Sequence, residues 1–437
     1  MAKHSATVMP VNGRRNQLLT DDRAAHDWYR FVLSYPPHLV RHYLDKFNVG
    51  TDQCVLDPLC GTGTTMVECR KHGIPSVGVE ANPMACFASR VKLDWRPDPD
   101  GLLSHAEKVS EAALKQLAAD GVEDDDFFSA PPKGPRNLRT LSVEQTALLL
   151  RDSISPLPLH KALVLIDAIE KRRGGLFADH ERLAFAKVVV ESASNLHFGP
   201  EVGVGEKKRD APVVYPWLKL VGGIARDLRE LRDLASVPAV VHGADAREID
   251  RLLEPSSVDA VITSPPYPNE KDYTRTTRLE SVLLGLVQTK DDLRRLKKGL
   301  VRSNTRSVYV GDEDDRWVSE HREVQRIAEA IEALRKELGK TSGFERQYAR
   351  LTKLYFGGMA RHFAGLRTVL RPGARLAYVV GDQASYLRVM IRTGKILGEI
   401  AEALGYEVVG RDLFRTRLST TTREQLREEV LLLRWPG

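Results

Sequence analysis

Residues 53–93 read QCVLDPLCGTGTTMVECRKHGIPSVGVEANPMACFASRVKL, and this stretch decides the fold. It alternates a short apolar run, a glycine turn, a helical segment and a second apolar run that leads into another helix. Strand, turn, helix and strand in this order make a βαβ unit, which implies a parallel sheet. The same rhythm returns in PAVVHGADA at 238–246, REIDRLLE at 247–254 and VDAVITSPP at 258–266.

Two interruptions divide this α/β pattern. Segment 96–237 is rich in helical periodicity, and segment 287–345 combines a basic stretch with a charged helix. The chain then ends in a strand-like run, RLAYVVGD, a helix, KILGEIAEALG, and two further strand-like runs, YEVVGRDLF and EEVLLLRW. We therefore predict an α/β fold, a doubly wound Rossmann-like sheet with a closing antiparallel hairpin and two largely helical inserts. The expected parts are a mobile N-terminal tail (1–22), a first core part (23–95), a helical insert (96–237), a core part with the 258–266 strand (238–286), a basic insert (287–345) and the end of the core (346–437).

Composition narrows the class of protein. The chain has 437 residues, a net charge of +6 and 42% hydrophobic residues, which suffices for a globular core. It has no apolar run of roughly 18 residues and no apolar segment at its start, so we expect a cytoplasmic protein without a membrane partner. Cys54, Cys60, Cys69 and Cys86 lack the paired spacing of a zinc site, so we expect buried reduced thiols and no metal. The basic balance is compatible with a polyanionic partner.

Ligands of doubly wound sheets bind beyond the carboxyl ends of the strands, so the strand ends are where chemistry is expected. Gly61 and Gly63 would let backbone N–H groups approach a ligand, although they equally suit a structural turn. Glu80 ends the next strand 19 residues after Gly61, where a carboxylate would accept from a ribose diol. Asp245 also ends a strand and would accept from an adenine amine or cap the following helix. Ser264-Pro265-Pro266-Tyr267 ends the strand after that.

Together these strand ends resemble the S-adenosylmethionine-dependent amino-methyltransferases of DNA, which modify N4 of cytosine or N6 of adenine. The similarity rests on DPLCGTGTT (57–65), VEANP (79–83), GADA (243–246) and TSPPYPNEKDY (263–273), and covers roughly half the chain. YPPHLVRHYL (35–44) resembles the segment that closes over the methionine end of the cofactor. The resemblance implies S-adenosyl-L-methionine as cofactor, with S-adenosyl-L-homocysteine as product. It implies cofactor contacts from Tyr35, Pro36, Asp57, Cys60, Gly61, Thr62, Gly63, Thr64, Thr65, Glu80, Ala81, Asp245 and Ala246.

The Ser-Pro-Pro-Tyr step suits the activation of an exocyclic amine, whose lone pair is delocalised into the ring. The Ser264 hydroxyl and the Pro265 carbonyl could each accept one N–H and aim the nitrogen at a sulfonium methyl. Pro265 and Pro266 would hold that carbonyl rigidly, which is preorganisation rather than added binding strength. Tyr267 offers a flat face for a base swung out of the duplex. A rigid proline turn with an exposed tyrosine is the alternative interpretation.

The resemblance favours cytosine N4, because serine at the first position is commoner among N4-cytosine enzymes and aspartate among N6-adenine enzymes. An N6-adenine DNA methyltransferase is the alternative. An RNA guanine-N2 methyltransferase fits less well. Those enzymes generally carry an RNA-binding domain ahead of the glycine loop, whereas only 56 residues precede Asp57 here. A non-catalytic DNA-binding subunit is a further alternative, against which the complete set of motifs argues. A cytosine-C5 methylase is disfavoured, because its chemistry needs a cysteine nucleophile on a Pro-Cys step and no cysteine follows Cys86.

Double-stranded DNA is therefore the expected partner, and a cognate restriction endonuclease would fit the same role. The residues that follow the tetrad, Asn269, Asp272, Tyr273 and Arg275, could bind the flipped base or fix the loop. Basic residues of the inserts fit phosphate contacts, although a solvated charged face is the ordinary interpretation of such runs. The candidates among them are Lys207, Lys208, Arg209, Arg295 and Lys298. Insert 96–237 is a candidate region for target recognition or DNA binding, and the sequence leaves open whether this insert or insert 287–345 reads the target.

Overall fold

The computed structural model describes residues 18–30, 34–124, 137–199, 201–234, 236–268, 271–418 and 425–437. Within these residues, seven strands form one sheet in the order β5-β2-β1-β6-β7-β9-β8. The strands are β1 (Val55–Asp57), β2 (Ser76–Val79), β5 (Ala239–His242), β6 (Val258–Thr263), β7 (Leu370–Gly381), β8 (Glu407–Leu418) and β9 (Gln425–Arg434).

The first five strands of the chain in this sheet run parallel, and β8 and β9 close it as an antiparallel hairpin. From β1 the chain proceeds outward through β2 to β5 and then returns to β6 on the other side of β1. The direction of winding therefore reverses between β1 and β6, which makes this the switch point where a doubly wound sheet binds ligands. The predicted doubly wound α/β fold with a closing hairpin is confirmed.

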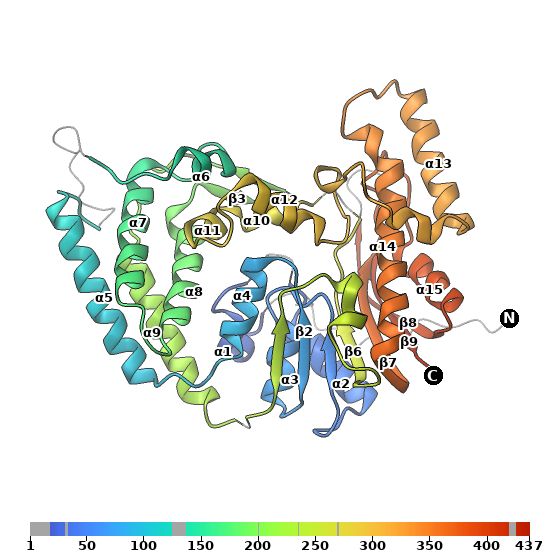
Figure 1. Ribbon diagram of the computed structural model, residues 1–437, viewed down its shortest axis with the longest axis horizontal. Helices are drawn as coiled ribbons and strands as arrows, with labels where there is room; N and C mark the ends of the chain where they lie inside the picture. Colours follow the sequence, from blue (N-terminus) through green and yellow to red (C-terminus); the bar gives the residue numbers. More distant parts are fainter. Residues whose placement is uncertain are drawn as a thin grey trace.

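Helices cover both faces of the sheet, because successive side chains of a strand point to opposite faces. Ala377 and Val379 of β7 pack on the side of α2, whereas Leu376, Tyr378 and Val380 pack with the helices of the other face. The covering helices, shown in Figure 1, are α2 (Pro37–Phe47), α3 (Thr64–Lys71), α4 (Pro83–Lys92), α14 (Tyr348–Val369) and α15 (Thr393–Ala403). A short helix, α1 (Arg23–His26), precedes them and is tied to α3 by a 2.7 Å contact between His26 and Glu68.

The first insert forms a helical layer beside the sheet, on the side of α4 (Figure 1). Trp217 is fully buried at its centre, where it donates to the Glu181 carbonyl oxygen. The elements are α5 (Pro99–Ala119), α6 (Val143–Leu148), α7 (Pro156–Lys171), α8 (Ala178–Val188), a π-helical turn (Val189–Ala193), β3 (Leu196–Phe198), β4 (Val202–Val204) and α9 (Val214–Leu231). The polar segment GPEVGVGEKKRDAP (199–212) contains β4, which pairs antiparallel with β3. Only two valines alternate there, too few to signal a strand.

The second insert lies above the carboxyl ends of the central strands (Figure 1). Its elements, with the helices that lead into it, are α10 (Tyr273–Thr276), α11 (Arg278–Leu283), α12 (Lys290–Lys298), α13 (Arg322–Glu337) and short 3₁₀ turns at Thr305–Ser307, Asp314–Val318 and Glu345–Gln347. The apolar stripe of α13, formed by Val324, Ile327 and Ile331, packs in the same core as α14. By contrast, α12 has no buried residue. The segment REIDRLLE, expected to be a helix, forms a 3₁₀ turn at Ala246–Arg251.

All four cysteines are free thiols; Cys60, Cys69 and Cys86 are buried and Cys54 is half-buried. None of the helices in the described ranges is both long and apolar enough to cross a membrane.

Candidate active site

A cavity of about 760 Å³ opens at the carboxyl ends of β1, β2, β5 and β6. That volume lies within the range of small-molecule sites in proteins. The glycine loop after β1 and the Ser264–Tyr267 tetrad after β6 both line it, so the two motifs share one space. Nine of the sequence-predicted cofactor residues line it: Tyr35, Cys60, Gly61, Thr62, Thr64, Glu80, Ala81, Asp245 and Ala246.

The two glycines of the loop are needed for different reasons. Both have positive φ, +52° at Gly61 and +83° at Gly63, which side chains rarely adopt. A Cβ on Gly61 would meet nothing within 4 Å, so its backbone faces open space in the cavity. A Cβ on Gly63 would lie 2.9 Å from Ser89 Oγ, so this glycine lets the loop and the start of α3 pack against α4.

Beneath the loop, a hydrogen-bonded group holds Tyr35 against the first strand. Asp57 is completely buried and accepts from the Tyr35 hydroxyl at 2.9 Å, and burial raises the pKa of this carboxyl to about 6. Thr65 bonds the same tyrosine hydroxyl and donates to the Ile262 carbonyl oxygen at 3.0 Å. Asp57 and Thr65 thus lie behind the cavity lining, together with Gly63, while Pro36 caps the start of α2.

Glu80 stands at the end of β2 with both carboxylate oxygens engaged by the backbone. Gly61 N–H donates to Oε2 at 2.8 Å and Asn82 N–H donates to Oε1 at 2.7 Å. Burial is the main cause that raises the pKa of Glu80 to about 7, and nearby Asp57 adds to it. Each oxygen keeps a further lone pair, so the carboxylate can accept two more hydrogen bonds from a ligand.

Asp245 both caps a helix and lines the cavity. Its carboxylate accepts from the backbone N–H of Arg247 at 2.9 Å, as in the capping interpretation. The guanidinium of Arg247 also donates to Asp245, reaches Asp314 Oδ2 at 2.5 Å and donates to the Lys298 carbonyl oxygen at 2.7 Å. Arg247 is buried, and these acidic partners raise its pKa despite the opposing effect of burial. This arginine therefore joins the end of β5 to the second insert.

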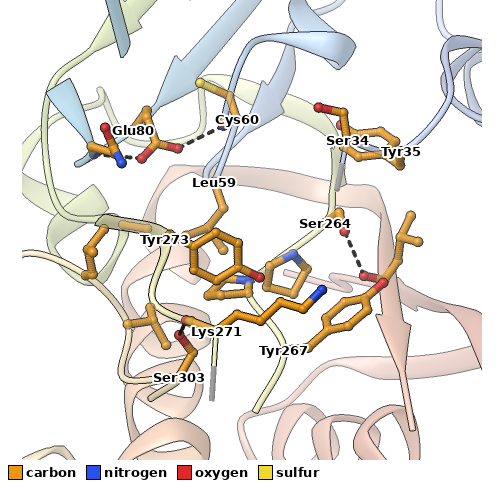
Figure 2. A pocket seen from close by; sticks show the side chains of 18 of the residues that line it. Ser34, Tyr35, Leu59, Cys60, Glu80, Ser264, Tyr267, Lys271, Tyr273 and Ser303 are labelled. Carbon is orange, nitrogen blue, oxygen red and sulfur yellow. Dashed lines mark hydrogen bonds between the residues drawn. The ribbon is translucent and has the colours of Figure 1, made fainter. Parts of the chain in front are cut away.

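The tetrad follows β6 directly and its residues are fixed by neighbouring strands (Figure 2). The Ser264 hydroxyl donates to the Val379 carbonyl oxygen at 3.3 Å, which leaves its lone pairs available as acceptors. Pro265 is buried, and Pro266 and Tyr267 are half-buried in the cavity wall. The Tyr267 ring packs so closely on Gly381 that a Cβ there would lie 2.9 Å from ring atom Cε2. Burial and nearby Glu428 raise the pKa of Tyr267, so its hydroxyl stays neutral.

Several lining residues carry no signal in the sequence. Lys271 extends between the rings of Tyr273 and Tyr267 (Figure 2). Ser303 and Asn304 of the second insert donate to the Lys271 carbonyl oxygen at 3.5 and 3.2 Å and line the same wall. Gln383, Ser385, Arg415, Glu428 and Glu201 also belong to the polar part of the lining. Except for Lys271, which lies in the stretch 263–273, no local pattern marks these positions, because long-range contacts bring them to the cavity.

The sequence-predicted nucleic-acid residues fall into two groups. Tyr273 lines the cavity, Arg275 reaches Glu201 at its edge, and buried Asp272 caps α10 and pairs with Lys297 at 3.2 Å. The others lie outside the lining: Lys207 pairs with Asp152, Lys208 donates to the Ser192 carbonyl oxygen, Arg209 is exposed, Arg295 pairs with Asp292 and Lys298 stacks over Tyr309. Asn269 lies outside the described residues.

The chain is similar to type II methyltransferases over almost its whole length. The type II methyltransferase M.BsoBI of Geobacillus stearothermophilus is 24% identical over 427 residues, covering 89% of this chain and 80% of its own. The type II methyltransferase M.AvaI of Nostoc is 23% identical over 452 residues, covering 94% and 86%. A solved Thermus thermophilus protein, described as a DNA modification methylase, is 17% identical over 44% of this chain and 51% of its own, with a TM-score of 0.22, so the fold assignment rests on the strand order instead. No family model matches.

Proposed function

We propose that this protein transfers a methyl group from S-adenosyl-L-methionine to the exocyclic N4 amine of a cytosine flipped out of duplex DNA. The observation that carries this proposal is the single cavity lined by both the glycine loop and Ser264–Tyr267. In a chain similar to type II methyltransferases along its length, that cavity offers a methyl-donor side and an amine-acceptor side.

The donor side suits this cofactor. The open backbone at Gly61, with Thr62, Thr64 and the Tyr35 ring, would hold the amino-acid part. The two remaining acceptor positions of Glu80 would take the ribose diol, and Asp245 with Ala246 would contact the adenine ring. When bound, the cofactor supplies an electrophilic methyl on a sulfonium. Asp57 and Thr65 would act through Tyr35, because they lie behind it.

The acceptor side would make the amine nucleophilic. The Ser264 hydroxyl already gives its hydrogen to Val379, so it presents lone pairs to one N–H of the amine. The Pro265 carbonyl would accept the other N–H, and the buried proline ring fixes where that oxygen lies. Two aimed acceptors favour a nitrogen with tetrahedral geometry, so the barrier falls through preorganisation. The attacking nitrogen loses one proton as the methyl is transferred, and no covalent enzyme intermediate is needed.

The wall formed by Tyr267, Tyr273 and Lys271 would hold the base. Stacking on an aromatic ring contributes roughly 1–3 kcal/mol per base, which offsets much of the cost of unstacking. The Lys271 ammonium carries three donors, and cytosine presents an O2 acceptor where adenine presents a C–H. This side chain therefore favours cytosine over adenine as the target.

Double-stranded DNA is the proposed partner, and insert 96–237 is the proposed region for reading the target sequence. By analogy with the type II relatives, a restriction endonuclease of the same specificity would be the functional partner in the cell.

The deciding experiment is methylation of plasmid DNA with labelled cofactor, followed by nucleoside mass spectrometry. We expect N4-methylcytosine, and no transfer by the Ser264→Ala variant. Detection of N6-methyladenine instead would mean that the target base is adenine. Transfer to RNA alone, or cofactor binding without transfer to any duplex, would overturn the proposal.

A further inference from the structure

The two inserts meet at one carboxylate on the edge of the active-site cavity. Glu201, which lies next to β4 of the first insert, lines that cavity. Its Oε2 lies 3.7 Å from Arg275 Nη1 of α10 and 3.7 Å from Arg306 Nη1 of the second insert. Three segments far apart in the sequence thus place one anionic oxygen between two guanidinium groups. The β3 strand and helices α10 and α12 gather in this part of the molecule (Figure 1).

The arginines are held in place by other contacts, so they do not need Glu201 to stay there. Arg306 stacks over the Phe344 ring at 5.2 Å, and its carbonyl oxygen accepts from Lys297. Arg275 lies in the short helix that Asp272 caps, directly after the tetrad segment. Its Nε is buried and lacks a hydrogen-bond partner in the described part of the chain. Both guanidinium groups therefore have donor capacity that Glu201 does not use.

The contacts with Glu201 are long and open to solvent. At 3.7 Å they exceed the 2.7–2.9 Å typical of charge-assisted hydrogen bonds. The side chains of Arg275, Arg306 and Glu201 are 23%, 34% and 47% exposed. An ion pair of this kind contributes little stability and exchanges readily for a stronger anion. A phosphodiester has two anionic oxygens, and arginine pairs with phosphate in a forked geometry.

We propose that Arg275 and Arg306 clamp a backbone phosphate beside the flipped nucleotide, and that Glu201 occupies the place of this phosphate when DNA is absent. This inference rests on the proposed function for the identity of the anion. Glu201 is then an intramolecular competitor: every duplex that reaches the cavity must displace it. Such competition weakens binding to all sequences, so that contacts made only by the correct target decide which duplex stays bound.

The test measures the affinity for a fluorescent duplex by anisotropy, in the full chain with S-adenosyl-L-homocysteine present. Glu201→Gln removes the competitor and keeps the shape, so we expect it to tighten binding about two- to fivefold. Glu206→Gln is the matched control, because Glu206 is exposed in the same polar loop and makes no ion pair within the described ranges. Glu206→Gln changes the net charge by the same amount as Glu201→Gln, and we expect it to increase the affinity for the duplex by less than half as much.

A double-mutant cycle separates this role from a general charge effect. In a chain that carries both Arg275→Gln and Arg306→Gln, Glu201→Gln should no longer tighten binding. Each arginine substitution alone should reduce the slope of log affinity against log salt by about 1, as expected for a lost phosphate contact.

The outcomes distinguish the two levels of the proposal. If wild-type protein bound no duplex even at low salt, the proposed function itself would fail. If it bound DNA but Glu201→Gln behaved like Glu206→Gln, the competitor role alone would be wrong. Weaker binding by Glu201→Gln would mean that Glu201 contacts DNA directly, which also overturns the inference. Binding of S-adenosyl-L-homocysteine verifies that each variant is folded, and Glu201→Ala, at a half-exposed position, should give the same direction of change.

Discussion

The hydroxyl of Ser264 donates to the main-chain carbonyl of Val379 across 3.3 Å. Val379 lies on β7, the strand next to β6, so the serine side chain is oriented by the sheet itself. In this orientation the hydroxyl keeps lone pairs that can accept from a group in the cavity.

Replacement of this hydroxyl should remove one of the two acceptors for the amine. We expect Ser264→Ala to lower kcat by about a hundredfold or more, the scale seen when one preorganised group is lost. Affinity for S-adenosyl-L-homocysteine, measured by calorimetry, should stay within about twofold, because we propose no cofactor contact for Ser264. A variant with near-normal turnover would contradict the assigned role.

Gly381 should matter because of Tyr267 rather than because of its own flexibility. A Cβ at Gly381 would lie 2.9 Å from the Tyr267 ring, so Gly381→Ala must displace the ring from the cavity wall. We expect single-turnover methylation to slow by about tenfold or more, with unchanged cofactor affinity. Gly410→Ala is the matched control, because a Cβ on this β8 residue meets nothing within 4 Å. Equal rates in both variants would show that the ring position is unimportant.

Cofactor affinity should depend on pH through Glu80. Its pKa is raised to about 7, so the carboxylate is charged above that pH and can accept from the ribose diol. As pH falls through 7, protonation competes, and affinity should fall by at most about tenfold per pH unit for one proton. The nearby carboxyl of Asp57, with a pKa of about 6, adds a second inflection lower down. Glu80→Gln should lower affinity at pH 8 and abolish the upper inflection; an unchanged profile would exclude Glu80.

Arg247 should stabilise the junction between the end of β5 and the second insert. Arg247→Ala leaves Asp245 without its cation and leaves Asp314 with only the more exposed Arg361 at 3.5 Å, so we expect a cost of up to about 3–5 kcal/mol, the scale for loss of one partner of a buried pair. We expect a loss of that size in urea unfolding, together with faster proteolysis of the second insert. Arg251→Ala in the same 3₁₀ turn should be nearly neutral, because this side chain is 73% exposed. Similar losses for both variants would refute the assignment.

Lys271 should influence which base is methylated. Lys271→Met keeps much of the length and removes the donors, so it should lower kcat/KM on cytosine targets by about 10–100-fold. Matched duplexes with cytosine or adenine at the target position give the measurement, and the ratio of their rates should shift toward adenine. An unchanged ratio would mean that Lys271 plays no part in the choice of base.

The parts of the fold that could be predicted are those that a short, local sequence pattern determines. The apolar runs that become β1, β2, β5 and β6 are short, and a glycine, an acidic residue or a proline follows each closely. These signals predicted where the strands end and therefore where the cavity lies. The glycine turn with Gly61 and Gly63 could be predicted in the same way. The sequence did not predict that the two glycines are needed for different reasons.

The second insert's share of the cavity could not be predicted. Its loop from Gly299 to Ser307 has no apolar periodicity and is held by Arg302, which donates to three main-chain carbonyl oxygens and pairs with Asp312. Such contacts depend on the folded arrangement of distant segments. Asp245 illustrates the same limit: the sequence left open whether it caps a helix or faces a ligand, and the structure has it capping while lining the cavity.

The ladder between β1 and β6 pairs Val55 with Ala260 and Leu56 with Val261, and each strand ends in one of the two motifs. Neighbouring strands stand about 4.8 Å apart, a spacing that backbone hydrogen bonds impose whatever the side chains are. The sheet thus fixes the spacing between the glycine loop and the Ser264–Tyr267 tetrad, and the helical segments around it do not set that spacing. Replacement of the helices of the first insert should therefore leave that spacing unchanged, whereas replacement of the second insert would also alter the cavity wall at 299–307.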